Sequence, residues 1–320
     1  MVRSCKCESH RGATLLATVC LLALVWAGPA VRASESEVSV TDDGNHRITL
    51  PAPARRVIAL SPALTEMVFA AGGGSRLVGA VEFSDFPEAA RAIPRVGDAL
   101  ALQMERILAL NPDLILAWQH GNNPRQLDRL EQLGVPIYYS HIDRLEDVPT
   151  TLERLGALLG TQAGASASAF RARLAGLGAT DDPSRASAAA REPPPSSPVR
   201  VLYQVWAKPL MTVNGRHVIS DLIERCGGVN VFAAESALVP QIGIEAAIAA
   251  APEVILASGS GDSRGGDTSL DHWRRYGAIP AVANDFLFLV DGDSISRATL
   301  RILDAGEAIC SHLARVRRLR

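Results

Sequence analysis

Residues 104–118, MERILALNPDLILAW, and residues 244–258, IEAAIAAAPEVILAS, repeat one pattern in two distant parts of the chain. In each segment a Glu opens a short helical pattern, a Pro ends it, and an acidic residue leads into an apolar run. Helices commonly end at or before a Pro, and a continuous apolar run of this length fits a strand buried on both faces of a parallel sheet. Each segment therefore predicts a helix followed by a buried parallel strand.

Further segments correspond between the two halves of the chain. In the first half, a strand, a helix that starts at Ser-Pro and a glycine stop are predicted from RRVIALSPALTEMVFAAGGG (55–74). In the second half, a strand is predicted from RVLYQVW (200–206), and a helix that ends at glycines from HVISDLIERCGG (217–228). LDRLEQLGVPIYYS (127–140) and LDHWRRYGAIPAV (270–282) each predict a helix, a Gly, a Pro and an apolar strand. The distance between the copies is too long for a solenoid repeat. The fold class expected is α/β, with two similar Rossmann-like lobes over 55–145 and 199–320.

The segment between the lobes reads as a connector. Residues 146–178 carry two helical apolar patterns separated at Gly160–Thr161, and the second helix is expected to be the only covalent connection between the lobes. Residues 179–198 are polar and rich in Pro, which is typical of a mobile surface loop. A single helical crossing predicts a stiff hinge.

The N-terminus reads as an export signal. Residues 1–33 place Arg3, Lys6 and Arg11 before an apolar run at 13–28 and end at Ala33, an arrangement typical of a cleaved secretory signal peptide. The alternative is a retained membrane anchor, but the run is shorter than the roughly 20 residues that span a bilayer.

Removal of the signal simplifies the cysteines and the charge. Of the five Cys only Cys226 and Cys310 remain, which predicts a disulfide in an oxidising compartment; two buried free thiols are the alternative. Four basic residues and one Glu leave with the signal, so the formal net charge of −2 becomes about −5. Nothing in this composition indicates nucleic-acid binding.

Several of these motifs together resemble a known family. The chain is similar to the helix-linked periplasmic binding proteins of bacterial ABC importers, which take cobalamin, haem or siderophores. The similarity rests on the runs VIALSPALTEMVFAAG, FSDFP, MERILALNPDLILAW, CGGVNVF, IEAAIAAAPEVIL and SRATLRILDAGEAIC. The resemblance is closest to the cobalamin (vitamin B12) binders and covers almost all of residues 55–315. It implies two lobes with the ligand in a cleft between them, a periplasmic location and delivery to a membrane permease.

The resemblance also gives the repeated Glu a role. In the family, a Glu on each lobe docks onto arginines of two permease subunits related by two-fold symmetry, and Glu105 and Glu245 match those positions. An acid in the first turn of a helix is favoured by the helix dipole, and two such acids meet two equivalent basic sockets and fix the orientation of docking. Ordinary carboxylates at helix starts are the alternative.

The ligand residues are likewise implied by the resemblance. Matching positions that contact or rim the ligand are Phe83, Trp118, Trp206, Met211, Asp293 and Arg297. Aromatic side chains suit a flat macrocycle, and Asp293 is placed to accept a hydrogen bond from a corrin amide. The alternatives are core packing for Trp118 and Trp206 and a turn or capping role for Asp293; Trp273 is expected in the core. The chain departs from the cobalamin binders at Ala99 and Val239, where they have Trp, and at Phe83, where they have Tyr.

Other functions predict other residue sets. Haem usually takes an axial Tyr or His, for which Tyr203 and His120 are the candidates, and an anionic ferric siderophore calls for a cluster of Arg. A metal-ion binder needs converging His and carboxylates, but the His residues lie singly along the chain, so we expect no metal site. An enzyme is not expected, because no nucleophile elbow or phosphate-binding loop is found. We therefore expect a monomeric binding protein without a cofactor, whose transported ligand is cobalamin.

Overall fold

The computed structural model describes residues 37–178, 197–259 and 270–320, within a compact unit that spans Glu37–Arg320. The predicted signal at 1–33 and nearly all of the predicted loop at 179–198 lie outside the described residues. Among the helices of the described part, none is both long and apolar enough to cross a bilayer.

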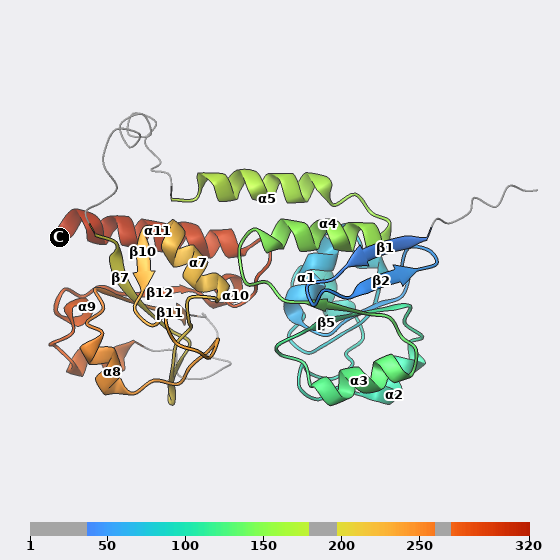
Figure 1. Ribbon diagram of the computed structural model, residues 1–320, viewed down its shortest axis with the longest axis horizontal. Coiled ribbons are helices and arrows are strands. Elements are labelled where there is room, and N and C mark those ends of the chain that lie inside the picture. The colour runs from blue at the N-terminus through green and yellow to red at the C-terminus, as the bar shows by residue number, and fades with distance from the viewer. Residues whose placement is uncertain (1–36, 179–196, 260–269) are drawn as a thin grey trace, which may run out of the picture. The chain divides into compact units, whose positions relative to one another are not determined.

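Two four-stranded parallel sheets form the framework (Figure 1). The first has the order β4-β3-β5-β6, with strands β3 (Val57–Ala59), β4 (Leu77–Ala80), β5 (Leu114–Trp118) and β6 (Ile137–Ser140). The second has the order β10-β7-β11-β12, with strands β7 (Val199–Gln204), β10 (Gly228–Asn230), β11 (Val254–Gly259) and β12 (Leu287–Asp291). The strands correspond in order, so the duplicated α/β architecture predicted from the sequence is confirmed.

Helices cover both sheets. The first sheet is accompanied by α1 (Pro62–Ala70), η1 (Gly74–Arg76), η2 (Glu88–Ala92), α2 (Met104–Ala109) and α3 (Pro124–Gln132). The second is accompanied by α7 (Val218–Arg225), α8 (Ile244–Ala249), η3 (Asp271–Arg275), α9 (Pro280–Ala283), α10 (Gly292–Ile295) and α11 (Ile302–Leu319). As predicted, α1 starts at Ser-Pro: the Ser61 side chain accepts a hydrogen bond from the backbone N–H of Leu64 at 3.1 Å, which satisfies one of the free N–H groups of the first turn.

The repeated sequence segments have the same local structure in both halves. The acidic residue after the Pro accepts a hydrogen bond from the backbone at the start of a neighbouring strand, β3 or β7. Asp113 accepts from the N–H of Arg56 at 2.9 Å, and Glu253 accepts from the N–H of Arg200 at 2.9 Å. The acidic residue that follows the Pro in the repeat therefore anchors the start of β5 or β11 to the neighbouring strand.

The same two arginines close the helices of the repeat. The Arg56 guanidinium donates to the carbonyl of Leu110 at 2.6 Å, and that of Arg200 donates to the carbonyl of Ala250. Carbonyls at a helix end have no partner within the helix, and a cation there is also favoured by the helix dipole. Both copies thus fix the position of α2 or α8 against its sheet in the same way.

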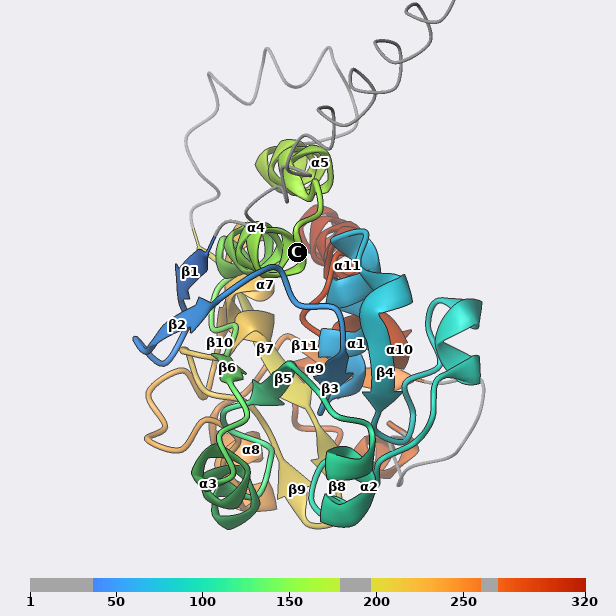
Figure 2. The same cartoon turned by 90° about the vertical axis from the view of Figure 1, so that its right-hand side faces the viewer.

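The connector contains two helices, α4 (Asp147–Leu159) and α5 (Gly164–Gly176). The break between them falls at Gly160, as predicted, because the chain there adopts a φ of 63°, a conformation that Gly reaches without penalty. Figure 2, which views these helices nearly end-on, shows α5 beside α4 and α11. Arg173 on α5 pairs with Asp304 and Glu307 of α11, each at 2.7 Å, so α5 is fastened to the second half of the chain.

One hydrophobic cluster runs through both halves on the side of these helices. It joins buried residues of both sheets with those of α1, α4, α5, α7 and α11. Two smaller clusters fill the opposite face of each sheet separately. Because the interior of the two halves is continuous on one side, their relative movement requires the rearrangement of packed side chains.

The predicted disulfide is confirmed. Cys226, at the C-terminal end of α7, is bonded to Cys310 in the middle of α11. It links two helices of the second half that also pack on each other.

Two features differ from the prediction. The prediction of a strand within 270–282 is wrong. Pro280–Ala283 forms the helical turn α9, and the strand follows later in the chain as β12. Pro is favoured at the first position of a helix because it has no N–H to leave unpaired. The sequence reading also missed the antiparallel hairpin of β1 (Val38–Thr41) and β2 (Arg47–Leu50), whose alternating apolar residues around an Asp-Gly-Asn turn were a usable signal.

Candidate ligand-binding cleft

Two adjoining cavities lie at the carboxyl ends of the two sheets, and we call them together the cleft. The larger has a volume of about 760 Å³, and the smaller about 300 Å³. Both are lined by residues of both halves, and those they share are Trp118, His120, Asp143, His217, Leu238 and Ser296. Ligands of open parallel sheets bind outside the carboxyl ends of the strands, and the larger volume falls in the usual range of roughly 300–1,000 Å³ for ligand sites.

Trp118 is held in the cleft by a buried amide. It is the last residue of β5 and is 46% exposed. The Asn122 side chain, itself 4% exposed, accepts from the N–H of Trp118 at 2.7 Å and donates to the carbonyls of Leu60 and Ala99 at 2.9 and 2.8 Å. The ring of Trp118 therefore lies partly exposed at the cleft on an anchored backbone and is not packed in the core. The sequence reading missed Asn122, which carries no signal of its role.

Trp206 faces the larger cavity from the second half and is 37% exposed. It belongs to a short hairpin of β8 (Trp206–Ala207) and β9 (Leu210–Met211), in which Trp206 pairs with Met211. Met211 itself is half-buried and is not among the residues that line the cleft. Trp273 is fully buried, as predicted, and its indole N–H donates to Gln204 at 2.7 Å.

Phe83 lies outside the lining of the cleft. Its side chain is 67% exposed, and its backbone has a φ of 62°, a conformation uncommon for a bulky residue. Its carbonyl accepts from Arg297 at 3.2 Å. The structure thus places Phe83 beside the contact between the two halves.

Arg297 lines the smaller cavity, but its charge is already paired. Its guanidinium donates to Glu66 at 2.7 Å and to Asp85 at 3.0 Å, and both acids belong to the first half. Burial lowers the pKa of Arg297, and the two carboxylates raise it by more. For Asp85 burial raises the pKa, and the hydrogen bond and charge of Arg297 bring it below its usual value. Arg297 therefore joins the two halves at the rim of the cleft.

Asp293 is 63% exposed and lies 3.5 Å from Arg297. A capping role was the alternative for Asp293, but the residue that caps α10 is Asp291. Its side chain accepts from the N–H of Ser294 at 2.9 Å. The pKa of Asp291 is lowered chiefly by hydrogen bonds from Ser294. Asp293 keeps a free side toward solvent near the rim.

His217 is a cleft residue that the sequence reading missed. It caps α7, and its Nδ1 accepts from the N–H of Ile219 at 3.2 Å. Burial lowers the pKa of His217 from 6.5 to about 4, against a smaller opposing effect of the Asp143 carboxylate. His217 is therefore neutral at physiological pH, with its proton on Nε2.

This lowered pKa predicts a loss of stability in mild acid. Between pH 6.5 and about 4 the unfolded chain binds a proton at His217 that the folded chain does not, so the free energy of unfolding falls as the pH falls, by about 3 kcal/mol in total. His217→Asn keeps a capping oxygen and removes the titration. Urea unfolding from pH 7.5 to 4 is expected to show the two proteins converging in stability as the pH falls; parallel curves would contradict the assignment.

Tyr203 and His120, the candidates for a haem ligand, differ in accessibility. Tyr203 lines the larger cavity but is only 2% exposed, and burial raises its pKa. A tyrosinate is therefore disfavoured there. His120 is exposed and lines both cavities.

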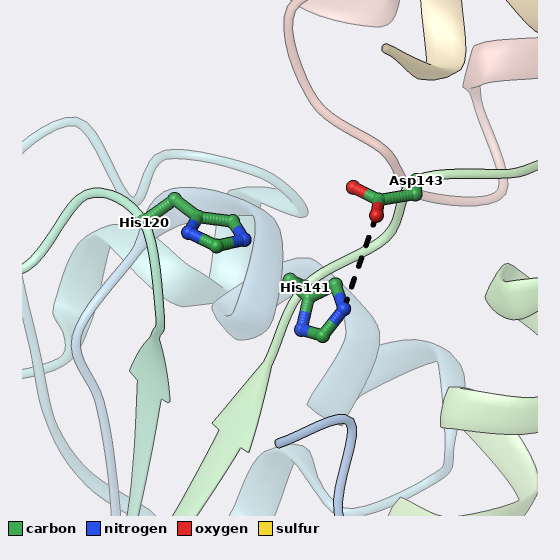
Figure 3. A group of neighbouring side chains, drawn as sticks. All are labelled: His120, His141 and Asp143. Atoms are coloured by element: carbon green, nitrogen blue, oxygen red, sulfur yellow. Dashed lines mark ion pairs between the residues drawn. The ribbon is translucent and has the colours of Figure 1, made fainter. Parts of the chain in front are cut away.

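His120 does not stand alone, although the sequence reading placed the His residues singly. His120 follows β5 and His141 follows β6, and their ring centroids are 5.2 Å apart. Asp143 completes a group whose nitrogen and oxygen atoms all lie within 4.8 Å of one another (Figure 3). The reading was wrong here because β5 and β6 are neighbours in a parallel sheet, and their carboxyl ends bring together residues that are distant in sequence.

Glu105 and Glu245 occupy the same place in the two halves. Each is the second residue of its helix, α2 or α8, and each is exposed. Neither forms an ion pair with another residue of the described part. Figures 1 and 2 place α2 and α8 on the side of the unit away from α4, α5 and α11.

A model of the periplasmic binding protein family matches residues 57–293. The chain belongs to this family. A vitamin B12-binding protein of Vibrio campbellii is 37% identical over 276 residues, which are 84% of this chain and 92% of that protein. The crystal structure of the periplasmic vitamin B12-binding protein of Vibrio cholerae matches with a TM-score of 0.71 at 35% identity and covers 82% of this chain and 98% of that one.

Haem-binding members of the family are also similar. A periplasmic haem-binding protein in complex with two haems matches with a TM-score of 0.65 at 26% identity over 82% of this chain and 98% of that one. The family and these relatives are binding proteins rather than enzymes. The predicted family and the predicted fold class are both confirmed.

Proposed function

We propose that this protein is a periplasmic binding protein that captures cobalamin in the cleft and delivers it to the permease of an ABC importer. The observation that carries the proposal is the pair Trp118 and Trp206, one from each half, partly exposed at a cavity of about 760 Å³. Partly exposed indoles from two sides offer flat apolar surfaces to a macrocycle. The similarity to vitamin B12-binding proteins supports a corrinoid as that macrocycle.

Polar groups of the cleft suit the amide side chains of a corrin. His217 presents a neutral Nε2–H to the cavity, because its other nitrogen accepts from Ile219. Asp143 and Ser296, which line the same cavity, supply acceptors. We infer that these groups fix the orientation of the ligand, together with the predicted contacts of Phe83, Met211, Asp293 and Arg297.

Export and docking belong to the same proposal. Residues 1–33 serve as a signal that is removed on export, and the two lobes over 55–145 and 199–320 act as units that close only slightly. Glu105 and Glu245 dock onto basic sockets of the two permease subunits. We expect the protein to work as a monomer, because its two halves already supply a pseudo-symmetric pair of contacts.

The second candidate function is haem binding. His120 is an exposed imidazole in the cleft, and imidazole is a common axial ligand of haem iron. Tyr203 is a weaker candidate, because its raised pKa disfavours the tyrosinate. A ferric siderophore is supported least: of the described arginines only Arg216 and Arg297 line the cleft, and Arg297 is paired with Glu66 and Asp85.

Titration with cyanocobalamin, cobinamide and haemin distinguishes these ligands. Corrinoids are expected to quench Trp fluorescence and to bind one per chain by calorimetry. Trp118→Ala is expected to weaken corrinoid binding roughly 10- to 100-fold, since burial of an aromatic ring contributes about 1.5–3 kcal/mol. Leu133→Ala, which shortens a side chain 52% exposed and outside the cleft, is the matched control and should change nothing. Haemin binding abolished by His120→Ala, with no binding of corrinoids, would overturn the proposal.

A further inference from the structure

Two imidazoles and a carboxylate converge at the edge of the first sheet, at the mouth of the cleft (Figure 3). His120 comes two residues after the end of β5, and His141 comes directly after the end of β6. The two strands pair in parallel with Trp118 opposite Ser140, and the N–H of Gln119 extends the pairing to the carbonyl of Ser140 at 3.0 Å. The backbone that carries both imidazoles is thus fixed by the sheet.

The tautomer of His141 is set by a neighbour. Its Nδ1 lies 2.7 Å from the side-chain oxygen of Gln119. Because that oxygen only accepts hydrogen bonds, Nδ1 carries the proton in the neutral ring and Nε2 keeps a lone pair. Ligating imidazoles characteristically donate their second ring N–H in this way to an oxygen, which fixes the ring and raises its basicity.

The free nitrogen of His141 faces a second acceptor. Nε2 lies 3.9 Å from the carboxylate of Asp143. In the neutral ring the lone pair of Nε2 and the carboxylate therefore face each other, and neither can donate a hydrogen bond to the other. A cation placed between them satisfies both. The ring of His120, with its centroid 5.2 Å from that of His141, adds a third donor on the same side.

We propose that His120, His141 and Asp143 bind a divalent transition ion of the Zn²⁺ class, with one coordination position open to the cleft. Two imidazoles and a carboxylate form the donor set of an open site that binds Zn²⁺ or Co²⁺ in preference to Mg²⁺ or Ca²⁺. Zn–ligand distances of about 2.0–2.1 Å require donors about 3.3 Å apart. The ligand atoms of the group all lie within 4.8 Å of one another, so they must approach by at most about 1.5 Å, and the exposed side chain of His120 is free to rotate toward the other two.

His217 is near this group but is not part of it. Its Nδ1 lone pair is used by the N–H of Ile219 at 3.2 Å, and His217 is not among the grouped ligand atoms. The fourth position therefore stays available to water or to a donor atom of a molecule in the cleft. The site goes beyond the proposed transport function and does not depend on it.

The test uses the untagged mature chain, without corrinoid, titrated with Co²⁺ and then with Zn²⁺. One Co²⁺ per chain with visible absorption bands of a low-coordinate nitrogen–oxygen site, displaced by one Zn²⁺, is expected. His120→Ala and His141→Ala should each weaken binding at least about 100-fold, and Gln119→Leu, which removes only the supporting oxygen, about 10- to 100-fold. Asp143→Asn keeps the shape of the side chain and should also lose the absorption bands.

His46→Ala is the matched control. His46 also lies beside a carboxylate, 3.2 Å from Asp42, but among the described residues it belongs to no group of three possible metal ligands. It should bind Co²⁺ as the unchanged chain does. Absence of binding, or binding that survives both His120→Ala and His141→Ala, would overturn the site. If the unchanged chain shows the Co²⁺ bands but binds no corrinoid, the proposed function is contradicted and the metal site is not.

Discussion

A chain in which Glu105 and Glu245 are both changed to Lys is expected to bind its ligand with unchanged affinity and to support no ligand uptake. Both side chains are exposed, outside the lining of the cleft, at equivalent positions of α2 and α8. At the proposed basic sockets of the permease, each Lys would replace an attraction with a repulsion, and like charges brought together at an interface cost several kcal/mol. Uptake in cells that lack their own copy of the protein should fall at least about 100-fold.

The matched control reverses two exposed acids elsewhere. Glu153→Lys with Glu224→Lys makes the same change of net charge on α4 and α7. Among the described residues it breaks one exposed ion pair, Glu153–Arg171, which is worth about 1 kcal/mol or less. Uptake should persist in this variant. A loss of ligand affinity in the Glu105/Glu245 variant would place those residues in the binding site instead, and normal uptake would remove them from docking.

Glu66→Ala is expected to lower the free energy of unfolding by about 3–5 kcal/mol. Glu66, on α1, is 5% exposed and accepts hydrogen bonds from Arg297 at 2.7 Å and from Arg301 at 2.6 Å. Its second oxygen accepts from Thr299 at 3.0 Å. Removal of this carboxylate leaves Arg301 without an ion-pair partner among the described residues, while Arg297 keeps Asp85. A largely buried charge without its partner costs far more than the pair itself contributes.

Urea unfolding measures this effect, with Glu153→Ala as control. The Glu153–Arg171 pair lies at distances of 2.6 and 2.8 Å, but both side chains are more than 40% exposed, so its loss should cost about 1 kcal/mol or less. Equal destabilisation by the two substitutions would show that the contact of Glu66 does not hold the halves together.

The duplicated fold was predictable because each copy carries its own local signals. The Pro residues after α2 and α8 and the uninterrupted apolar runs of β5 and β11 determine helix ends and buried strands without reference to the rest of the chain. The same signals misled at Pro280, which stands at the first position of helix α9 and not at the start of a strand.

The site was predictable only in part. Trp118 and Trp206 were expected at the ligand because their positions match those of the resembled family, and both line the cleft. The partners of Arg297 were not, since Glu66 is 231 residues away in the sequence. The grouping of His120 with His141 depends on which strands become neighbours, and His217 acquires its lowered pKa only through burial.

A crystal structure of the protein grown with cyanocobalamin tests the central claim most directly. The corrin ring is expected in the cleft, in contact with the rings of both Trp118 and Trp206, with its amide side chains within hydrogen-bond distance of His217 or Asp143. A corrin bound at any other surface, or a cleft left empty at saturating ligand, would contradict the account.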